Sequence, residues 1–246
     1  MPIINPKPFL HSVAVQENQH FPPINFEQYP FRIPAVQQIE KVNFHADVTF
    51  LVGENGSGKS TLLEAIAVAL GFGSEGGTRN VQFQTANTIS QLSHYLRLAQ
   101  GPQRPLDGYF LRAESFYNVA TYMDSTGYLF EYGGKSLHER SHGEAFMALL
   151  TTKFRGHGLY LLDEPEAALS PQRQLTALSA IHQLVQDHSQ FIIATHSPIL
   201  MSYPRAKILL CDDTGIREIA YEETEHYRIT RKFLNDYKAY LHHLLQ

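Results

Sequence analysis

The chain has 246 residues, of which 43% are hydrophobic and 18% are charged, a balance typical of a globular domain and not of a disordered chain. Its 20 Lys and Arg against 24 Asp and Glu give a net charge of −4, which excludes a uniformly basic nucleic-acid coat protein but not a local basic groove. The single cysteine, Cys211, excludes an intrachain disulfide and a cysteine-based metal cluster within one chain. No segment approaches the roughly 18–20 consecutive apolar residues of a membrane span, and residues 1–8 lack the apolar stretch of a secretory signal. We therefore expect a cytoplasmic protein that does not insert into a membrane by itself.

The first 34 residues contain seven of the 13 prolines. Because proline lacks the amide donor and clashes with the preceding helical turn, we expect extended strands and loops there, with an edge strand at residues 10–15.

Short apolar strands then alternate with amphipathic helices. Expected strands lie at residues 48–52, 80–85, 109–112, 159–162 and 191–194, and a hairpin joins 207–210 to 216–220. Expected helices lie at residues 60–70, 89–100, 141–154, 171–187 and 224–246. This alternation predicts an α/β fold with a mainly parallel sheet.

Residues 53–60 match the phosphate-loop pattern G-x-x-x-x-G-K-[ST] without a mismatch. They follow a predicted strand and precede a predicted helix, which is the context the motif requires. Glycines let successive backbone amides turn toward phosphate oxygens, and the following helix adds its positive dipole end. Lys59 would reach the β- and γ-phosphates, and the Ser60 hydroxyl would bind Mg²⁺. The alternative is a strand–turn–helix junction that merely needs glycine.

Polar residues follow two of the predicted buried strands. Asp163 and Glu164 come after residues 159–162, and His196 comes shortly after residues 191–194. Ligands of open parallel sheets lie beyond the carboxyl ends of the strands. We expect Asp163 to hold Mg²⁺ through water and Glu164 to orient or deprotonate the attacking water. His196 would donate a hydrogen bond to the γ-phosphate; a solvated turn and a packed histidine are the alternatives.

Five segments together resemble the ABC-type ATPase superfamily, and in particular its small single-domain bacterial ATPases on the RecF and SMC side. They are a Walker A motif at residues 53–60, a signature at 141–144, a Walker B motif at 159–164, a D-loop at 167–170 and a switch histidine at 196. The resemblance implies a P-loop NTPase of ABC type. Its mainly parallel central sheet would be flanked by helices and accompanied by an antiparallel N-terminal part and a small helical lobe.

The resemblance also implies a head-to-tail homodimer that holds two ATP molecules between its subunits. Ser141 and Gly143 of one chain would close over the γ-phosphate held by the other. For Ser141 a plain helix cap is the alternative, because Glu144 three residues later would complete a capping box. The expected catalytic residues are Lys59, Glu164 and His196. The expected nucleotide contacts are Gly53, Glu54, Asn55, Gly56, Ser57, Gly58, Lys59, Ser60, Thr61, Ser141 and Gly143.

Some positions depart from the superfamily pattern. Ser170 stands where the D-loop usually has Asp, and Glu114 stands where the Q-loop glutamine is expected, with Gln82 and Gln84 as weaker candidates. We therefore expect the metal set to be Ser60, Asp163 and Glu114. Phe31 is the best upstream aromatic for stacking on adenine, although packing against the sheet would also explain it.

We expect one ATPase domain over residues 1–246. Its first lobe would take residues 1–77 and 155–223, its helical lobe 78–154, and a C-terminal helix 224–246. The helical lobe is rich in aromatic residues interleaved with arginines, a composition that can grip single-stranded nucleic acid but also suits a core with a solvated rim.

Two function classes remain open beyond ATP hydrolysis. One is an ATPase that acts on nucleic acid or on a partner protein; the other is the ATP-binding subunit of a membrane transporter. Ser170 favours the first, and so does the signature, which has His142 and Glu144 where transporters usually have Gly and Gln. A third alternative is a slow ATP-gated switch.

Overall fold

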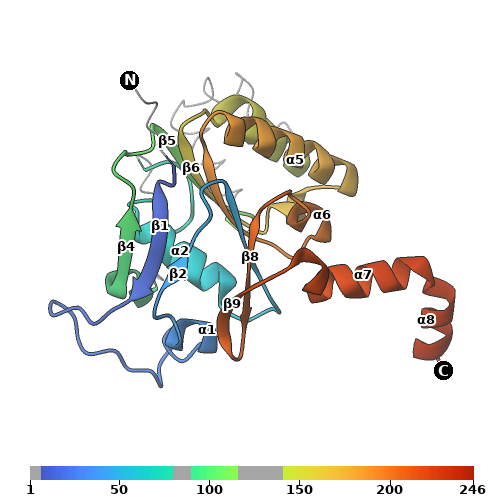
Figure 1. Ribbon diagram of the computed structural model, residues 1–246, viewed down its shortest axis with the longest axis horizontal. Coiled ribbons are helices and arrows are strands. Elements are labelled where there is room, and N and C mark those ends of the chain that lie inside the picture. The colour runs from blue at the N-terminus through green and yellow to red at the C-terminus, as the bar shows by residue number, and fades with distance from the viewer. Residues whose placement is uncertain (1–6, 80–89, 116–140) are drawn as a thin grey trace.

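A six-stranded sheet forms the centre of the computed structural model, which describes residues 7–79, 90–115 and 141–246 (Figure 1). The strand order is β5-β6-β7-β3-β8-β9. The first five strands in this order run parallel, and β9 is antiparallel to β8. The mainly parallel α/β sheet expected from the sequence is therefore confirmed. The strands are β3 (Val48–Val52), β5 (Asp107–Arg112), β6 (Gly158–Asp163), β7 (Gln190–Ala194), β8 (Lys207–Asp212) and β9 (Gly215–Ile219).

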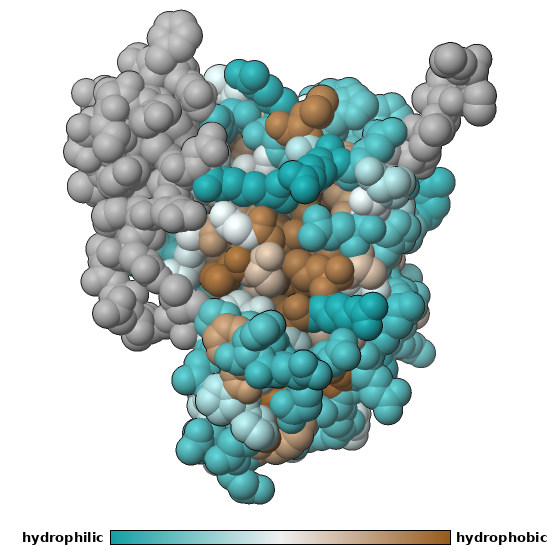
Figure 2. All heavy atoms as spheres, turned by 90° about the vertical axis from the view of Figure 1, so that its left-hand side faces the viewer, coloured by the Kyte–Doolittle hydropathy of each residue, from teal (hydrophilic) through white to brown (hydrophobic). Residues whose placement is uncertain are grey.

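A second, antiparallel sheet has the order β2-β1-β4. Its middle strand β1 (Leu10–Val15) pairs with β2 (Val42–Asn43) on one side and β4 (Leu96–Gln100) on the other. The expected strand at residues 10–15 is thus confirmed, but the expectation of an edge position was wrong. On the side of the molecule that carries β1 and β4, apolar residues gather in the middle of the face, and hydrophilic residues lie above, below and to the right of them (Figure 2).

The helix expected at residues 89–100 was wrong. Residues Gln91–Tyr95 form a 3-10 turn, η1, and the chain then continues as β4. Leu96 and Leu98 are partly buried against the core, whereas the intervening Arg97 is exposed. This alternation is the strand period, and β1 supplies the hydrogen bonds that a helix would have made internally.

Helices cover both faces of the central sheet. Helix α2 (Lys59–Ala69) lies between the two sheets, where Leu62, Leu63 and Ile66 pack against residues of β1, β6 and β7. Helices α4 (His142–Ala148), α5 (Pro171–Gln186) and α6 (Pro198–Met201) pack on the opposite face. The parallel strands are buried on both faces, as their continuous apolar sequences predict. This burial fixes the strand ends that carry the site.

The C-terminal segment consists of two helices, not the single helix expected at residues 224–246. Helix α7 (Glu225–Asn235) ends at Asp236, whose backbone φ of −148° interrupts the helical path, and α8 (Tyr237–Leu244) follows. The Asp236 side chain accepts a hydrogen bond from the amide of Ala239 and so caps α8. The two helices project from the rest of the molecule (Figure 1).

Several expectations fall on residues outside the described ranges. The strand at residues 80–85, the glutamines Gln82 and Gln84, and most of the aromatic stretch lie there. The division into lobes stays a prediction; within the range expected for the helical lobe, β4 and β5 are members of the two sheets. Among the residues that the structure describes, no helix combines the length and apolarity that crossing a bilayer requires.

Candidate nucleotide site

The candidate residues lie at one edge of the central sheet, because the carboxyl ends of four neighbouring strands are in register. Ala194 of β7 pairs with Leu51 of β3 and with Asp163 of β6, and Asp163 pairs with Arg112 of β5. Strand order and parallel direction therefore bring together the phosphate loop, the acidic pair and the histidine, although more than 100 residues separate the first from the last.

The phosphate loop runs from β3 into α2 and closes on itself. Gly58 is the residue before the helix and has φ +95°, a left-handed conformation that side chains disfavour, and the Ile33 side chain occupies the place a Cβ would take. Lys59 Nζ donates hydrogen bonds to the carbonyls of Gly53 and Glu54 at 2.9 and 2.8 Å. An ammonium group has three protons, so one remains for a phosphate oxygen. Burial lowers the pKa of Lys59, and the carboxylates of Glu164 and Asp163 oppose that shift.

Two of the three residues expected to hold magnesium, Ser60 and Asp163, contact each other. The Ser60 hydroxyl donates to Asp163 Oδ1 at 2.9 Å. Burial raises the pKa of Asp163 to about 6, while that hydrogen bond and the Arg112 guanidinium, whose Nε lies 3.7 Å from Asp163 Oδ2, act in the opposite direction.

A hydroxyl beside a carboxylate fits a magnesium ion, which commonly takes one or two protein oxygens and completes its shell with water and substrate phosphates. Ser57 Oγ in the loop is buried and has no hydrogen-bond partner among the described residues, as suits a hydroxyl available to a ligand. Among the described residues, no group of three or more His, Cys, Asp or Glu side chains is arranged to hold a metal ion.

Glu164 and His196 face each other beside the phosphate loop. Glu164 has φ +51° and ψ +50°, a left-handed conformation that costs a non-glycine residue about 1–3 kcal/mol and is concentrated at functional sites. Its Oε1 lies 3.6 Å from His196 Nε2. The backbone amide of His196 donates to Glu166 Oε1 at 2.5 Å, so Glu166 fixes the loop that carries the histidine. Burial raises the pKa of Glu166 and lowers that of His196.

A groove of about 750 Å³ runs alongside the phosphate loop. Glu164 lines it, and so does Glu114, whose side chain is 84% exposed and pairs with Arg112 Nη2 at 3.4 Å. Of the predicted nucleotide contacts, Asn55, Gly56, Gly58, Lys59, Ser60 and Thr61 line this groove, and Gly53, Glu54 and Ser57 line the adjoining cavity of about 520 Å³.

The aromatic residue at the groove is Tyr29, not Phe31. Phe31 is buried against Tyr95 with ring centroids 5.1 Å apart, so the packing alternative for Phe31 is confirmed and adenine stacking by it is excluded. Tyr29 is 61% exposed, lines the groove, and its hydroxyl lies 3.3 Å from Thr61 Oγ1.

Ser141 and Gly143 lie outside both cavities as lined by the described residues. Ser141 begins α4 with a complete capping box: its hydroxyl and its amide donate to Glu144 Oε2 at 2.8 and 2.9 Å, and the Glu144 amide donates back to Ser141 Oγ. Arg173 Nη1 also donates to Ser141 Oγ at 3.2 Å. The helix-cap alternative therefore describes Ser141 within one chain, and its contact with nucleotide stays a prediction. Ser170 likewise caps α5 through the Arg173 amide.

Sequence reasoning missed four residues of this region. Arg112 lies beside Asp163, Glu166 supports the histidine loop, Tyr29 lines the groove, and His226 of α7 contacts His196 at 2.9 Å. Glu166 lies two residues after Glu164 and Tyr29 two residues before Phe31, so both could have been considered. Arg112 and His226 come from distant strands or helices, and only the folded chain places them here.

The AAA domain family matches residues 24–140, which include the phosphate loop. This match is consistent with the ABC-type P-loop ATPase superfamily. No curated protein sequence matches the chain significantly.

The chain is also weakly similar to several solved structures. They include an SMC head bound to the C-winged helix domain of ScpA (13% identity, TM-score 0.48, 86% of this chain and 98% of that chain). They also include an ATP-binding cassette of an ABC transporter in its ADP conformation (16% identity, TM-score 0.46, 93% of this chain and 98% of that chain). A third is a dimeric bacterial ABC transporter cassette (17% identity, TM-score 0.42, 75% of this chain and 90% of that chain).

Proposed function

We propose that the chain binds ATP with Mg²⁺ and hydrolyses it to ADP and phosphate. The observation that carries the proposal is the hydrogen bond of 2.9 Å between Ser60 of the phosphate loop and Asp163 at the end of β6. It joins the two motifs that a P-loop ATPase needs in one place, and Lys59, Glu164 and His196 surround it.

In this proposal each residue of the site has its own role in binding or hydrolysis. The amides of the phosphate loop and Lys59 bind and orient the phosphates, while Ser60 and Asp163 hold the metal, with Glu114 at the rim of the groove. Bound Mg²⁺ would neutralise charge on the β- and γ-phosphates. Glu164 orients the attacking water and accepts its proton, and His196 donates a hydrogen bond from Nε2 to the terminal phosphate.

We further propose that two copies of the chain pair head to tail around two ATP molecules. Within one chain Ser141 and Gly143 do not line the groove that holds the other candidates, which is the arrangement that a contribution in trans would require. Ser141 would then exchange its contact with Glu144 for a phosphate oxygen. The single ATPase domain and its lobes are part of this proposal.

Glu164→Gln tests both statements. It removes the proton acceptor but keeps the shape, so we expect ATP binding to persist, turnover to stop and dimers to accumulate. Phosphate release measures turnover, and light scattering in the presence of MgATP measures mass. The matched control is Glu218→Gln on β9, an exposed glutamate paired with Lys207, which should keep full turnover. Normal turnover in the Glu164 variant would overturn the assigned role, and a monomer at every ATP concentration would overturn the dimer.

Lys59→Ala tests the phosphate loop directly. The substitution removes the cation that faces the β- and γ-phosphates, so ATP binding should be abolished in equilibrium dialysis. Unchanged ATP affinity would contradict the phosphate-loop assignment.

The partner is proposed to be nucleic acid or another protein, with a transporter subunit as the alternative. ATPase rates measured with and without single- and double-stranded DNA separate these classes. Stimulation by DNA supports the first class, and co-purification with membrane-spanning subunits supports the second.

A further inference from the structure

Helix α7 contributes a second histidine to the candidate site. His226 Nε2 lies 2.9 Å from His196 Nδ1, and the two rings meet at 60° with centroids 5.1 Å apart. The other nitrogen of His196, Nε2, is buried, lies 3.6 Å from Glu164 Oε1, and has no hydrogen-bond partner among the described residues. The two ring nitrogens of His196 thus face two different groups.

The position of His226 is fixed by its neighbours. Thr224 at the start of α7 is 1% exposed; its hydroxyl accepts from the Tyr227 amide and donates to the carbonyl of Tyr221 at 2.7 Å. The Tyr221 hydroxyl in turn donates to the carbonyl of Pro198 at 2.7 Å. Because Pro198 follows His196 by two residues, α7 begins against the loop that carries the switch histidine.

Two neutral imidazoles can share one hydrogen bond in two ways, because each ring has one N–H and one bare nitrogen. If His196 donated from Nδ1, its bare Nε2 would face the Glu164 carboxylate lone pair to lone pair. If His226 donates instead, His196 carries its proton on Nε2, and that proton points toward Glu164. The carboxylate therefore favours the second arrangement. Burial lowers the pKa of both histidines, which favours neutral rings.

We propose that His226 is a positioning residue that donates a hydrogen bond from Nε2 to His196 Nδ1 and, together with the Glu164 carboxylate, holds the His196 ring with its proton on Nε2. The tautomer of a histidine is set by the hydrogen bond that its other nitrogen makes. The Nε2 proton is the one that would reach the terminal phosphate, so this inference rests on the ATPase function proposed above.

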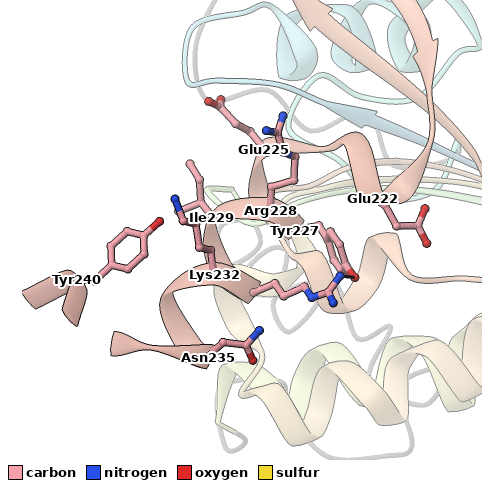
Figure 3. A pocket seen from close by; sticks show the side chains of 9 residues that line it. Glu222, Glu225, Tyr227, Arg228, Ile229, Lys232, Asn235 and Tyr240 are labelled. Carbon is pink, nitrogen blue, oxygen red and sulfur yellow. Dashed lines mark hydrogen bonds between the residues drawn. The ribbon is translucent and has the colours of Figure 1, made fainter. Parts of the chain in front are cut away.

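A substitution at His226 leaves the rest of α7 able to make its other contacts. Arg228, Ile229 and Lys232 line a separate pocket of about 540 Å³ with Tyr240 of α8, and His226 does not take part in it (Figure 3). Lys232 Nζ lies 5.4 Å from the centre of the Tyr240 ring there.

The tautomer is tested by long-range proton–nitrogen NMR correlation of the imidazole rings in the full chain without nucleotide. We expect His196 to have a protonated Nε2 in the wild type and in His226→Gln, since the glutamine Nε2 amide sits at the same distance from the backbone and is also a donor. In His226→Leu the bare Nδ1 loses its hydrogen-bond donor, so its nitrogen resonance should shift toward that of a free imidazole nitrogen, while Glu164 still favours the proton on Nε2. A wild-type His196 protonated on Nδ1, or an Nδ1 resonance that is the same in wild type and His226→Leu, would overturn the proposal.

Kinetics provide the second readout. His226→Leu should lower kcat roughly ten- to a hundred-fold, by analogy with groups that orient metal-binding histidines, with little change in KM for ATP. His226→Gln should recover most of kcat. His182→Leu is the control, because it removes another histidine whose Nδ1 makes a hydrogen bond, to the Tyr203 hydroxyl at 3.0 Å, outside the site.

The outcomes separate this inference from the ATPase proposal. A wild type without ATPase activity refutes the proposed function, whereas the NMR tautomer still decides the role of His226. An active wild type whose His226→Leu and His226→Gln variants lose kcat equally refutes the hydrogen-bond role, since a purely structural defect would show no rescue by the donor.

Discussion

Asp163 should destabilise the nucleotide-free chain at neutral pH, and Asp163→Asn should relieve this. The carboxyl group is buried at the end of β6, where burial raises its pKa from 3.8 to about 6. Asparagine keeps the shape and an acceptor for the Ser60 hydroxyl, which donates to Asp163 Oδ1, but it has no charge to bury.

The direction in which stability changes with pH follows from proton linkage. Between pH 3.8 and about pH 6 the folded state holds the Asp163 proton more tightly than the unfolded chain, so stability is greatest below this window and is lost as pH rises through it. The gap between the two pKa values corresponds to about 3 kcal/mol, of which about 2 kcal/mol falls between pH 4.5 and pH 7.5. Structural relaxation makes these figures upper bounds.

Urea unfolding of wild type and Asp163→Asn at pH 4.5 and 7.5 measures the effect. The advantage of the variant should be greater at pH 7.5 by about 2 kcal/mol or less. The other buried acids titrate in both proteins and cancel in the difference. Asp213→Asn, in the exposed β8–β9 turn, is the control and should change the free energy of unfolding by less than about 0.5 kcal/mol at either pH. An advantage that does not depend on pH would refute the reasoning.

Three further predictions address packing and nucleotide contact. Ile66→Ala, at a fully buried position of α2 between the two sheets, should lower the free energy of unfolding by about 2–5 kcal/mol in urea titrations. Tyr160→Phe should cost about 0.5–1.5 kcal/mol by the same assay, because it removes the hydrogen bonds of the buried hydroxyl with Asp107 and Arg155, which still bond to each other. Tyr29→Ala should raise the KM for ATP roughly tenfold if its exposed ring stacks on the base, while Tyr29→Phe should leave it unchanged; equal KM values in the two variants would exclude stacking.

The elements that the sequence predicted correctly are those whose pattern is local. The strand before the phosphate loop and the helix after it combine an apolar run, a glycine turn and a helical start within about 20 residues, and they appear as β3 and α2. The hairpin of β8 and β9 was marked by its Asp-Asp-Thr-Gly turn. Such signals do not depend on what the segment packs against.

Two of the errors occurred where a distant partner decides the conformation, and the third, at Asp236, has a local cause. Residues 96–100 became a strand because β1 lies beside them, and β1 is a middle strand because β4 covers its second edge. The C-terminal helix breaks at Asp236, whose side chain caps the next helix instead of continuing the first.

The sequence by itself identified the motifs of the candidate site. They are a glycine loop with a lysine, a carboxylate pair after a buried strand, and a histidine after another buried strand. Only the tertiary structure decided which side chains complete it. Parallel register joins Arg112 to Asp163, and the path of α7 brings His226 to His196. The physical reason for this difference is that each motif consists of residues close together in the sequence. Contacts between strand ends and helices, in contrast, depend on how the whole core packs.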